Sequence, residues 1–349
     1  STPKPSSAAS DVYKRQLSVG LLFNFYRRKS FLFALLFMSI IFSGFRYDAG
    51  NDFFSYLDML IGVKNYDQLE FLAVKLIDLS YLVGTPTFFY LVTSLIYISV
   101  LGYALCRAHA LSFTSVFLLL FFTASWLTSF GYIRQFVSIS FFFLSFVFLF
   151  ERKYFFYLLF AIISFFFHKS ALVTIPAVLF YVVFARQERS VVYYAIVLIV
   201  SLIAKDLLVY LIRYFGIFTQ YIEFSINSYG VGIFKVLLFV LVVNVGVAKF
   251  LKVKNDNFWI YSNMLFFGVL LYGALLSFGE YVVRVAYFFV PFFYVSSAYL
   301  IDELGARWKL LMLAFYIVIG SFTYYYTLYL AGANPTRDFL TNYKFVLFL

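Results

Sequence analysis

Apolar residues dominate the chain in long runs, and short polar segments interrupt these runs. The stretch FLFALLFMSIIFSG, for example, contains no charged residue, and similar runs recur to the end of the chain. Runs of this kind approach the roughly 20 residues that a helix needs to cross about 30 Å of hydrocarbon. The pattern therefore predicts membrane-spanning helices, and it differs from the short alternating segments of a transmembrane β-barrel.

We predict a single all-α polytopic membrane domain over residues 17–349, with about 11 or 12 transmembrane helices. The helices are expected at 17–26, 30–45, 87–106, 111–128, 133–150, 154–168, 170–185, 190–204, 230–250, 257–277, 283–301 and 308–329. Residues 1–16 are expected to be a disordered or non-native tail, because DVYKRQ resembles translated adapter sequence at the ends of fragmented genes.

The basic residues predict how these helices are oriented. If RRK at 27–29 is cytoplasmic, every short loop on that side contains Lys or Arg, as cytoplasmic loops do. The other side contains the long segments 46–86, 205–229 and 330–349, and the first of these is acidic on balance. We therefore expect these three segments to face outward, together with the polar cluster FRYDAGNDFFSY at 45–56.

The first outer segment contains a candidate amphipathic helix at residues 66–83, YDQLEFLAVKLIDLSYLV. At helical periodicity its apolar residues share one side, and its charged residues share the other: Asp67, Glu70, Lys75 and Asp78. This pattern is typical of a helix that lies on the membrane surface. Residues 206–224 show the same pattern less clearly.

Composition excludes several classes of protein. Only 12% of the residues are charged, compared with about 25% in soluble domains. The net charge of +11 comes from basic residues scattered between apolar runs, so a nucleic-acid partner is not expected. The single cysteine, Cys106, cannot form an intramolecular disulfide. The two histidines, His109 and His168, are predicted to lie on opposite sides of the membrane, which argues against a multi-histidine metal site.

Charged residues from four distant segments are predicted to meet at one level, the outer surface of the membrane. Arg46 and Asp52 begin the first outer loop, whereas Arg134, His168 and Arg284 lie at the outer ends of later helices. A charge at membrane depth costs roughly 2.5–3.5 kcal/mol on insertion scales. Their convergence at one level therefore indicates a functional site.

Each of the three arginines also has a simpler interpretation. Arg46 could extend its side chain to the membrane surface from a helix end. Arg134 could form a buried ion pair with Asp52 or Glu280. Arg284 follows Glu280 by four residues, so these two could pair within one helix.

Arginine is a natural ligand for phosphate, because its planar fork donates two parallel hydrogen bonds. The three arginines would suit a pyrophosphate whose lipid tail stays in the bilayer. Asp52 or His168 could accept a proton from an attacking hydroxyl group. The sequence contains no nucleotide-binding loop, serine-nucleophile elbow or HExxH motif, as expected for a site that faces away from cytosolic nucleotides.

Three segments resemble motif blocks of the EpsG family. FRYDAGNDFFSY is similar to the pattern R-x-x-x-G-x-D-[YF]-x-x-Y, GYIRQ with the later FHKS resembles a second block, and RVAYFFVPFF resembles a third. The resemblance covers roughly residues 30–345. The matching residues are Arg46, Gly50, Asp52, Tyr56, Arg134, Gln135, His168, Ser170 and Arg284. Two departures are Phe136 and Val137 in place of a small residue, and Tyr343 without a preceding proline.

The resemblance implies a polysaccharide polymerase of bacterial exopolysaccharide or capsule assembly, related in role to the Wzy O-antigen polymerases. Such a glycosyltransferase joins repeat units carried on undecaprenyl pyrophosphate at the outer face of the cytoplasmic membrane, with no metal or other cofactor. Arg46, Arg134 and Arg284 would hold the pyrophosphate, and Asp52 or His168 would be the catalytic base. The residues expected to support the site or contact the sugar are Gly50, Tyr56, Gln135, Ser170 and Glu280.

Two other functions stay open at this point. The first is a flippase or exporter of lipid-linked glycan, which should place charged residues deep within its helices, where only Lys235 is a candidate. The second is a membrane O-acyltransferase that modifies the polysaccharide. The expected partners are lipid-linked oligosaccharides and membrane lipid, with a chain-length regulator and other assembly proteins as further candidates.

Overall fold

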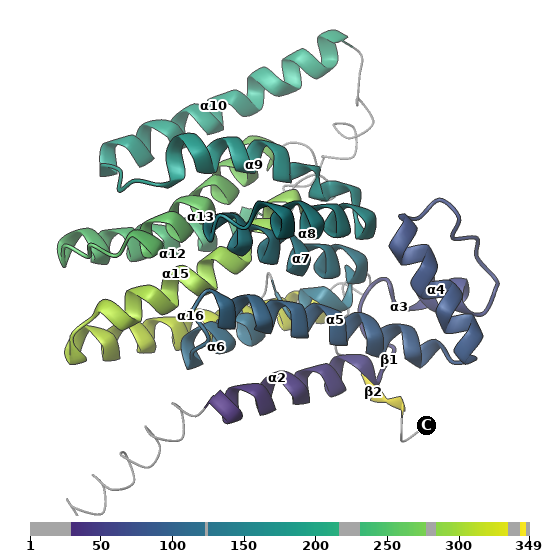
Figure 1. The fold of residues 1–349 in the computed structure, drawn as a ribbon. Coiled ribbons are helices and arrows are strands. Elements are labelled where there is room, and N and C mark those ends of the chain that lie inside the picture. Colours follow the sequence, from purple (N-terminus) through teal and green to yellow (C-terminus); the bar gives the residue numbers. More distant parts are fainter. Residues whose placement is uncertain (1–28, 123–124, 216–230, 277–283, 334–342, 347–349) are drawn as a thin grey trace, which may run out of the picture.

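The computed structural model describes residues 29–122, 125–215, 231–276, 284–333 and 343–346, and these residues are almost entirely helical (Figure 1). The first half contains α2 (Lys29–Gly44), β1 (Arg46–Tyr47), α3 (Phe53–Leu60), α4 (Phe71–Val83), α5 (Pro86–Arg107), α6 (Phe113–Phe121), η1 (Thr128–Phe130), α7 (Ile133–Phe150), α8 (Tyr154–Phe167), η2 (Lys169–Val173), α9 (Thr174–Phe180) and η3 (Tyr181–Ala185). The second half contains α10 (Val191–Phe215), α12 (Val231–Phe250), α13 (Asp256–Leu275), η5 (Arg284–Phe289), α15 (Val290–Glu303), α16 (Ala306–Ala333) and β2 (Lys344–Phe345).

Many of these helices have the length and composition of membrane spans. Within the described ranges, six are long and apolar enough to cross a membrane: Pro86–Arg107, Ile133–Phe150, Gly232–Phe250, Asp256–Leu275, Arg284–Glu303 and Ala306–Tyr329. Shorter apolar helices accompany them at Lys29–Gly44, Tyr154–Phe167, Lys169–Ala185 and Val191–Ala204. The protein is therefore an all-α, multi-pass membrane protein, which confirms the predicted fold class. The predicted first span, 17–26, and the predicted tail, 1–16, lie outside the described residues.

Helix α7 lies at the centre of the bundle. Most of its residues are buried, and it packs against α5 and α8. Phe142 illustrates the packing, since its ring makes edge-to-face contacts with Phe288, Phe289 and Phe292 at centroid distances of 5.1, 5.5 and 6.3 Å. In a membrane, small residues let helices approach closely, and α7 carries buried Ser138, Ser140 and Ser145. Both ends of α7 are consequently held in fixed positions.

The loops at one end of the bundle are basic and are tied together by polar contacts. Arg107 at the end of α5 forms a 2.6 Å ion pair with Glu151 at the end of α7. The Tyr299 hydroxyl of α15 donates a hydrogen bond to the Ala108 carbonyl at 2.6 Å. The loops that were predicted to be cytoplasmic thus share one end of the molecule. The side of the membrane that this end faces stays a prediction.

The opposite end contains the first polar loop and the C-terminal strand. β1 pairs antiparallel with β2, so that Arg46 lies opposite Phe345 and Tyr47 lies opposite Lys344. Helices α3 and α4 lie at the same end, where α4 packs against α5 and α8 (Figure 1). The first family-like block and the C-terminal strand therefore meet beside the polar cluster.

Helix α6 is shorter than predicted. It ends at Phe121, and the turn η1 occupies residues 128–130, so the predicted span 111–128 is only partly helical. The Ser129 hydroxyl donates a 2.5 Å hydrogen bond to the Trp126 carbonyl. Such side-chain bonds to the backbone compete with regular helix, and they favour the turn that leads into α7.

Two other predicted boundaries are also wrong. Helix α10 continues to Phe215, well beyond the predicted end at 204, because residues 205–215 contain good helix formers and no Gly or Pro. The predicted outer loop 205–229 therefore begins as helix, and its remainder lies outside the described residues. The amphipathic helix starts at Phe71 instead of 66 and ends at Gly84, whose φ of +75° favours glycine. Its location on the membrane surface stays a prediction.

Candidate functional site

The loop after α2 packs tightly against the turn before α7. Gly50 has a φ of +95°, which side chains other than glycine rarely adopt. A Cβ atom at this position would lie 2.2 Å from the carbonyl oxygen of Phe130. Only glycine permits this close approach, so Gly50 brings the loop with Arg46 and Asp52 beside the start of α7.

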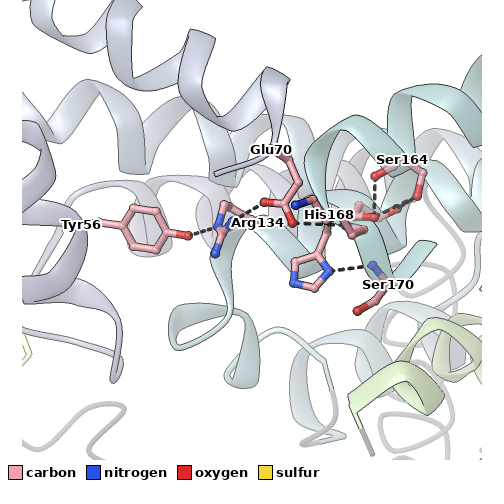
Figure 2. Close-up of polar contacts among 8 residues, drawn as sticks. Tyr56, Glu70, Arg134, Ser164, His168 and Ser170 are labelled. Atoms are coloured by element: carbon pink, nitrogen blue, oxygen red, sulfur yellow. Dashed lines mark hydrogen bonds and ion pairs between the residues drawn. The ribbon is translucent and has the colours of Figure 1, made fainter. Parts of the chain in front are cut away.

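Arg134, in the first turn of α7, joins two parts of the first outer segment. Its Nε donates a 2.6 Å hydrogen bond to the Tyr56 hydroxyl, and a terminal nitrogen forms an ion pair with Glu70 (Figure 2). The Tyr56 ring stacks on Phe89 with centroids 5.1 Å apart, and burial raises the pKa of its hydroxyl. Tyr56 is therefore a neutral and rigid contact that orients the guanidinium.

A pair of serines brings Arg134 close to the turn that contains His168. The hydroxyls of Ser138 and Ser164 each donate to the other's carbonyl oxygen at 2.8 Å (Figure 2). Small residues allow helices to approach closely in membranes. Arg134 precedes Ser138 by four residues and His168 follows Ser164 by four. One helical turn therefore separates the serine contact from each candidate site residue.

His168 is held as a neutral imidazole. Its Nδ1 accepts a hydrogen bond from the Ser170 backbone N–H at 3.2 Å. Burial lowers the pKa of His168 to about 4, with the positive charges of Arg134 and Arg284 acting in the same direction and Glu70 opposing them. Because Nδ1 is an acceptor, the proton of the neutral ring is assigned to Nε2. His168 therefore offers a hydrogen-bond donor at Nε2.

Glu70 contacts both sides of this site, although its helical periodicity predicted a place on the polar face of a surface helix. One carboxylate oxygen contacts Arg134, and the other accepts a 3.2 Å hydrogen bond from the backbone N–H of Lys169. Arg134 thus pairs with Glu70, a partner that the sequence did not suggest, and the negative charge of Asp52 also acts on it. Glu70 reaches Arg134 because α4 starts at residue 71 and leaves Glu70 turned toward the bundle.

Arg284, at the start of η5, completes the group of basic residues around His168. Its guanidinium carbon lies 3.7 Å from the centroid of the Tyr132 ring, a favourable cation–π arrangement. The Gln135 side-chain amide donates a 2.9 Å hydrogen bond to the Arg284 carbonyl. The second and third family-like blocks are thus in direct contact, and Gln135 positions the backbone that carries Arg284.

Arg46 has a different environment from the other two arginines. It is only 2% exposed, and a terminal nitrogen donates to the Ser43 carbonyl at the end of α2. Its guanidinium lies 5.0 Å from the Tyr90 ring centroid and 4.8 Å from that of Phe130. Burial lowers the pKa of Arg46 to about 10, so it remains charged at neutral pH. These contacts are those of a cation that caps a helix C-terminus.

A small cavity adjoins Arg46. Its lining includes Thr93, Ser94 and Ser129, and its volume is about 10 Å³, which is roughly the space that one water molecule needs. A diphosphate group does not fit into this cavity as the structure has it. The prediction that Arg46 binds pyrophosphate therefore stays a prediction, and it requires a conformation more open than this one.

The predicted acidic residues occupy different places. Asp52 is half-buried at the start of α3, and its charge acts on the Tyr56 hydroxyl. Asp48 lies in the preceding turn with a φ of +54°. Glu280 is outside the described residues. Within the described ranges, no group of three or more His, Cys, Asp or Glu side chains could hold a metal ion.

An all-α membrane bundle with two arginines and a neutral histidine gathered at one end is therefore the class of protein that the structure defines. The sequence model of the EpsG family matches residues 29–345, nearly the whole chain, and the chain belongs to this family. Searches of curated proteins and of solved structures found no match. Membership of the EpsG family points to a membrane protein of the polysaccharide-polymerase type.

Proposed function

We propose that the protein is a polymerase that joins oligosaccharide repeat units carried on undecaprenyl pyrophosphate, at the outer face of the bacterial cytoplasmic membrane. The observation that carries this proposal is the grouping of Arg134, Arg284 and His168 at one end of the membrane helices. Arginine is well suited to a lipid-bound diphosphate because its fork matches phosphate oxygens. Because the helices next to this group are apolar, the lipid tail can stay in the bilayer while the diphosphate contacts the arginines.

The proposed reaction is a glycosyl transfer. A hydroxyl oxygen of the acceptor unit attacks the anomeric carbon of the donor sugar, and the bond from that carbon to the pyrophosphate oxygen breaks. The hydroxyl proton passes to a base, and the lipid pyrophosphate leaves. Arg134 and Arg284 stabilise the negative charge that develops on this leaving group.

We assign the role of base to Asp52 and not to His168. The Nδ1 atom of His168 already accepts the Ser170 N–H, and its Nε2 carries the ring proton. His168 is therefore suited to donate a hydrogen bond to a phosphate oxygen. Asp52 is the residue just before α3, and the nearby Phe54 side chain is exposed and offers an aromatic face to a sugar.

The assignment of Asp52 is tested with a matched pair of substitutions. We expect Asp52→Asn to lower polymer synthesis by roughly 10²–10⁴-fold, the range for loss of a general base. Asp48→Asn, four residues away, should leave synthesis within about twofold, because asparagine tolerates the positive φ at this position. Equal activity of the two variants would remove Asp52 from the catalytic role.

The function itself is tested by analysing lipid-linked intermediates in a strain that lacks this gene. Loss of a polymerase leaves single repeat units on the outer face, whereas loss of a flippase leaves them inside. Loss of an O-acyltransferase leaves full-length polymer without acyl groups. The flippase alternative has little structural support, since Lys235 is exposed near the start of α12 and does not line a path.

A further inference from the structure

Glu70 connects the two halves of the proposed pyrophosphate site. Its side chain is only 11% exposed, and its two carboxylate oxygens contact Arg134 and the backbone N–H of Lys169. Glu70 is the N-cap residue of α4 but makes no side-chain capping hydrogen bond. Its carboxylate is therefore used for contacts between elements and not for its own helix.

The contacts of Arg134 leave part of its guanidinium open. Tyr56 accepts from Nε and Glu70 accepts from one terminal nitrogen, whereas the second terminal nitrogen has no hydrogen bond to a described residue. Free arginine side chains carry about 2 kcal/mol of rotamer entropy. Two fixed contacts remove this freedom before a ligand binds, and the remaining donors keep a defined direction.

The same carboxylate also holds the turn that contains His168. Lys169 N–H donates to Glu70, and the next backbone N–H, that of Ser170, donates to His168 Nδ1. Figure 2 shows the His168 ring and the remaining terminal nitrogen of Arg134 on the same side of Glu70. Glu70 thus contacts both the guanidinium of Arg134 and the turn that carries His168, the two candidate phosphate donors.

We propose that Glu70 is a positioning residue, which fixes the Arg134 guanidinium and the His168 turn relative to each other so that both donate to one diphosphate group. This inference rests on the proposed function. The opposite role is that the Glu70 carboxylate occupies the place of a phosphate and must be displaced. The two roles predict changes of opposite sign in diphosphate affinity when the charge of Glu70 is removed.

The test measures the binding of farnesyl diphosphate, a short prenyl diphosphate, to the full-length protein in lipid nanodiscs. We expect Glu70→Gln to weaken binding by roughly 10-fold or more, as for other hydrogen bonds to charged groups. The control Asp67→Asn removes an exposed acid from the same segment and should change binding by less than about twofold. Tighter or unchanged binding by the Glu70→Gln variant overturns the inference.

A double-substitution cycle separates positioning from a general effect on the fold. If Glu70 acts through Arg134 as well as through the His168 turn, Glu70→Gln should cause a clearly smaller loss of affinity in the Arg134→Gln protein than in the wild type. If the double variant shows the full product of the two single affinity losses, Glu70 acts independently of Arg134, and the proposal is wrong. Glu70→Asp, which keeps the charge but shortens the reach to both partners, should give an intermediate loss, and it provides the same test if Glu70→Gln does not fold.

The same measurement distinguishes failure of this inference from failure of the proposed function. If the wild-type protein binds farnesyl diphosphate, and Arg134→Gln abolishes binding while Glu70→Gln does not weaken it, only the role of Glu70 is wrong. If the wild-type protein shows no binding at all, both the diphosphate site and the role of Glu70 are wrong.

Discussion

Arg46 and Arg134 lie at the same end of the bundle, and both contact aromatic side chains, yet their environments differ. Arg46 is 2% exposed, and its charge is satisfied by the Ser43 carbonyl and two aromatic rings. The side chain of Arg134 is 25% exposed, is oriented by Tyr56 and Glu70, and retains donors for a further partner. A shared membrane level therefore does not imply a shared role. The useful distinction is whether the protein encloses the arginine or leaves part of it exposed to a further partner. Arg46 is enclosed, although its buried Nε has no hydrogen-bond partner among the described residues, whereas Arg134 is partly exposed.

The largest effect that this comparison predicts is a loss of polymer synthesis when Arg134 is replaced. We expect Arg134→Gln to lower polymer synthesis by roughly 10²–10³-fold, since it removes an electrostatic contact to the leaving group. Its thermal unfolding in detergent should stay close to that of the wild type, because glutamine can still contact Tyr56 or Glu70. A folded variant with normal polymer length would contradict the role given to Arg134.

Arg46→Gln should reduce the stability of the protein more than its activity. We expect a loss of roughly 2–3 kcal/mol in the free energy of unfolding, because a buried cap and its cation–π contacts are removed. Chemical denaturation in detergent micelles measures this change. If the Arg46→Gln variant is as stable as the wild type but fails to bind farnesyl diphosphate, Arg46 is a pyrophosphate ligand, as the sequence predicted, and the comparison is wrong.

Gly50 tests the contact that brings the two regions together. Gly50→Ala should destabilise the protein by roughly 1–3 kcal/mol, since alanine meets both an unfavourable φ and the Phe130 carbonyl. Gly84 is a matched control with a φ of +75° and nothing within 4 Å of a Cβ atom, so Gly84→Ala should cost about 1 kcal/mol. Equal losses in denaturation experiments would show that the approach to Phe130 is not tight.

The smallest expected effect is a pH dependence from His168. Its pKa of about 4 in the folded protein lies below the ordinary value of 6.5, so the unfolded chain binds a proton more readily at intermediate pH. Stability is therefore fully present above about pH 6.5 and is lost as the pH falls toward 4. Between pH 7 and 5 the wild type should lose roughly 1–2 kcal/mol more than His168→Asn. The same pH dependence in both proteins would contradict the burial of His168.

Much of the architecture follows from the sequence because hydrophobic runs and basic loops are local signals. The helices at 86–107 and 133–150 agree with prediction within one residue, and the basic loops share one end. The approach of Arg134 and Arg284 to His168 was expected from their common level in the membrane. The unbroken continuation of α10 to Phe215 was missed, although residues 206–224 show a weak amphipathic pattern.

The parts of the site that the sequence did not predict depend on tertiary contacts. Glu70 was assigned to a polar helix face because periodicity alone cannot show that the helix starts at Phe71, just after Glu70, and not at residue 66. Its position just before the apolar run of α4, as a possible N-cap, was the available signal. The burial of Arg46 depends on rings from Tyr90 and Phe130, which belong to other elements and have no motif in common with Arg46.

The central claim is that lipid-linked sugar binds at the end of the bundle that contains Arg134, Arg284 and His168. Site-specific photo-crosslinking in membranes tests it most directly, with a photoreactive amino acid at Phe54 near this site or at Tyr154 near the basic end. Both side chains are well exposed, at 48% and 62%. With radiolabelled lipid-linked repeat unit, we predict crosslinks at position 54 that disappear in the Arg134→Gln background, and none at position 154. Crosslinks at 154 alone, or crosslinks at 54 that persist without Arg134, would contradict the account.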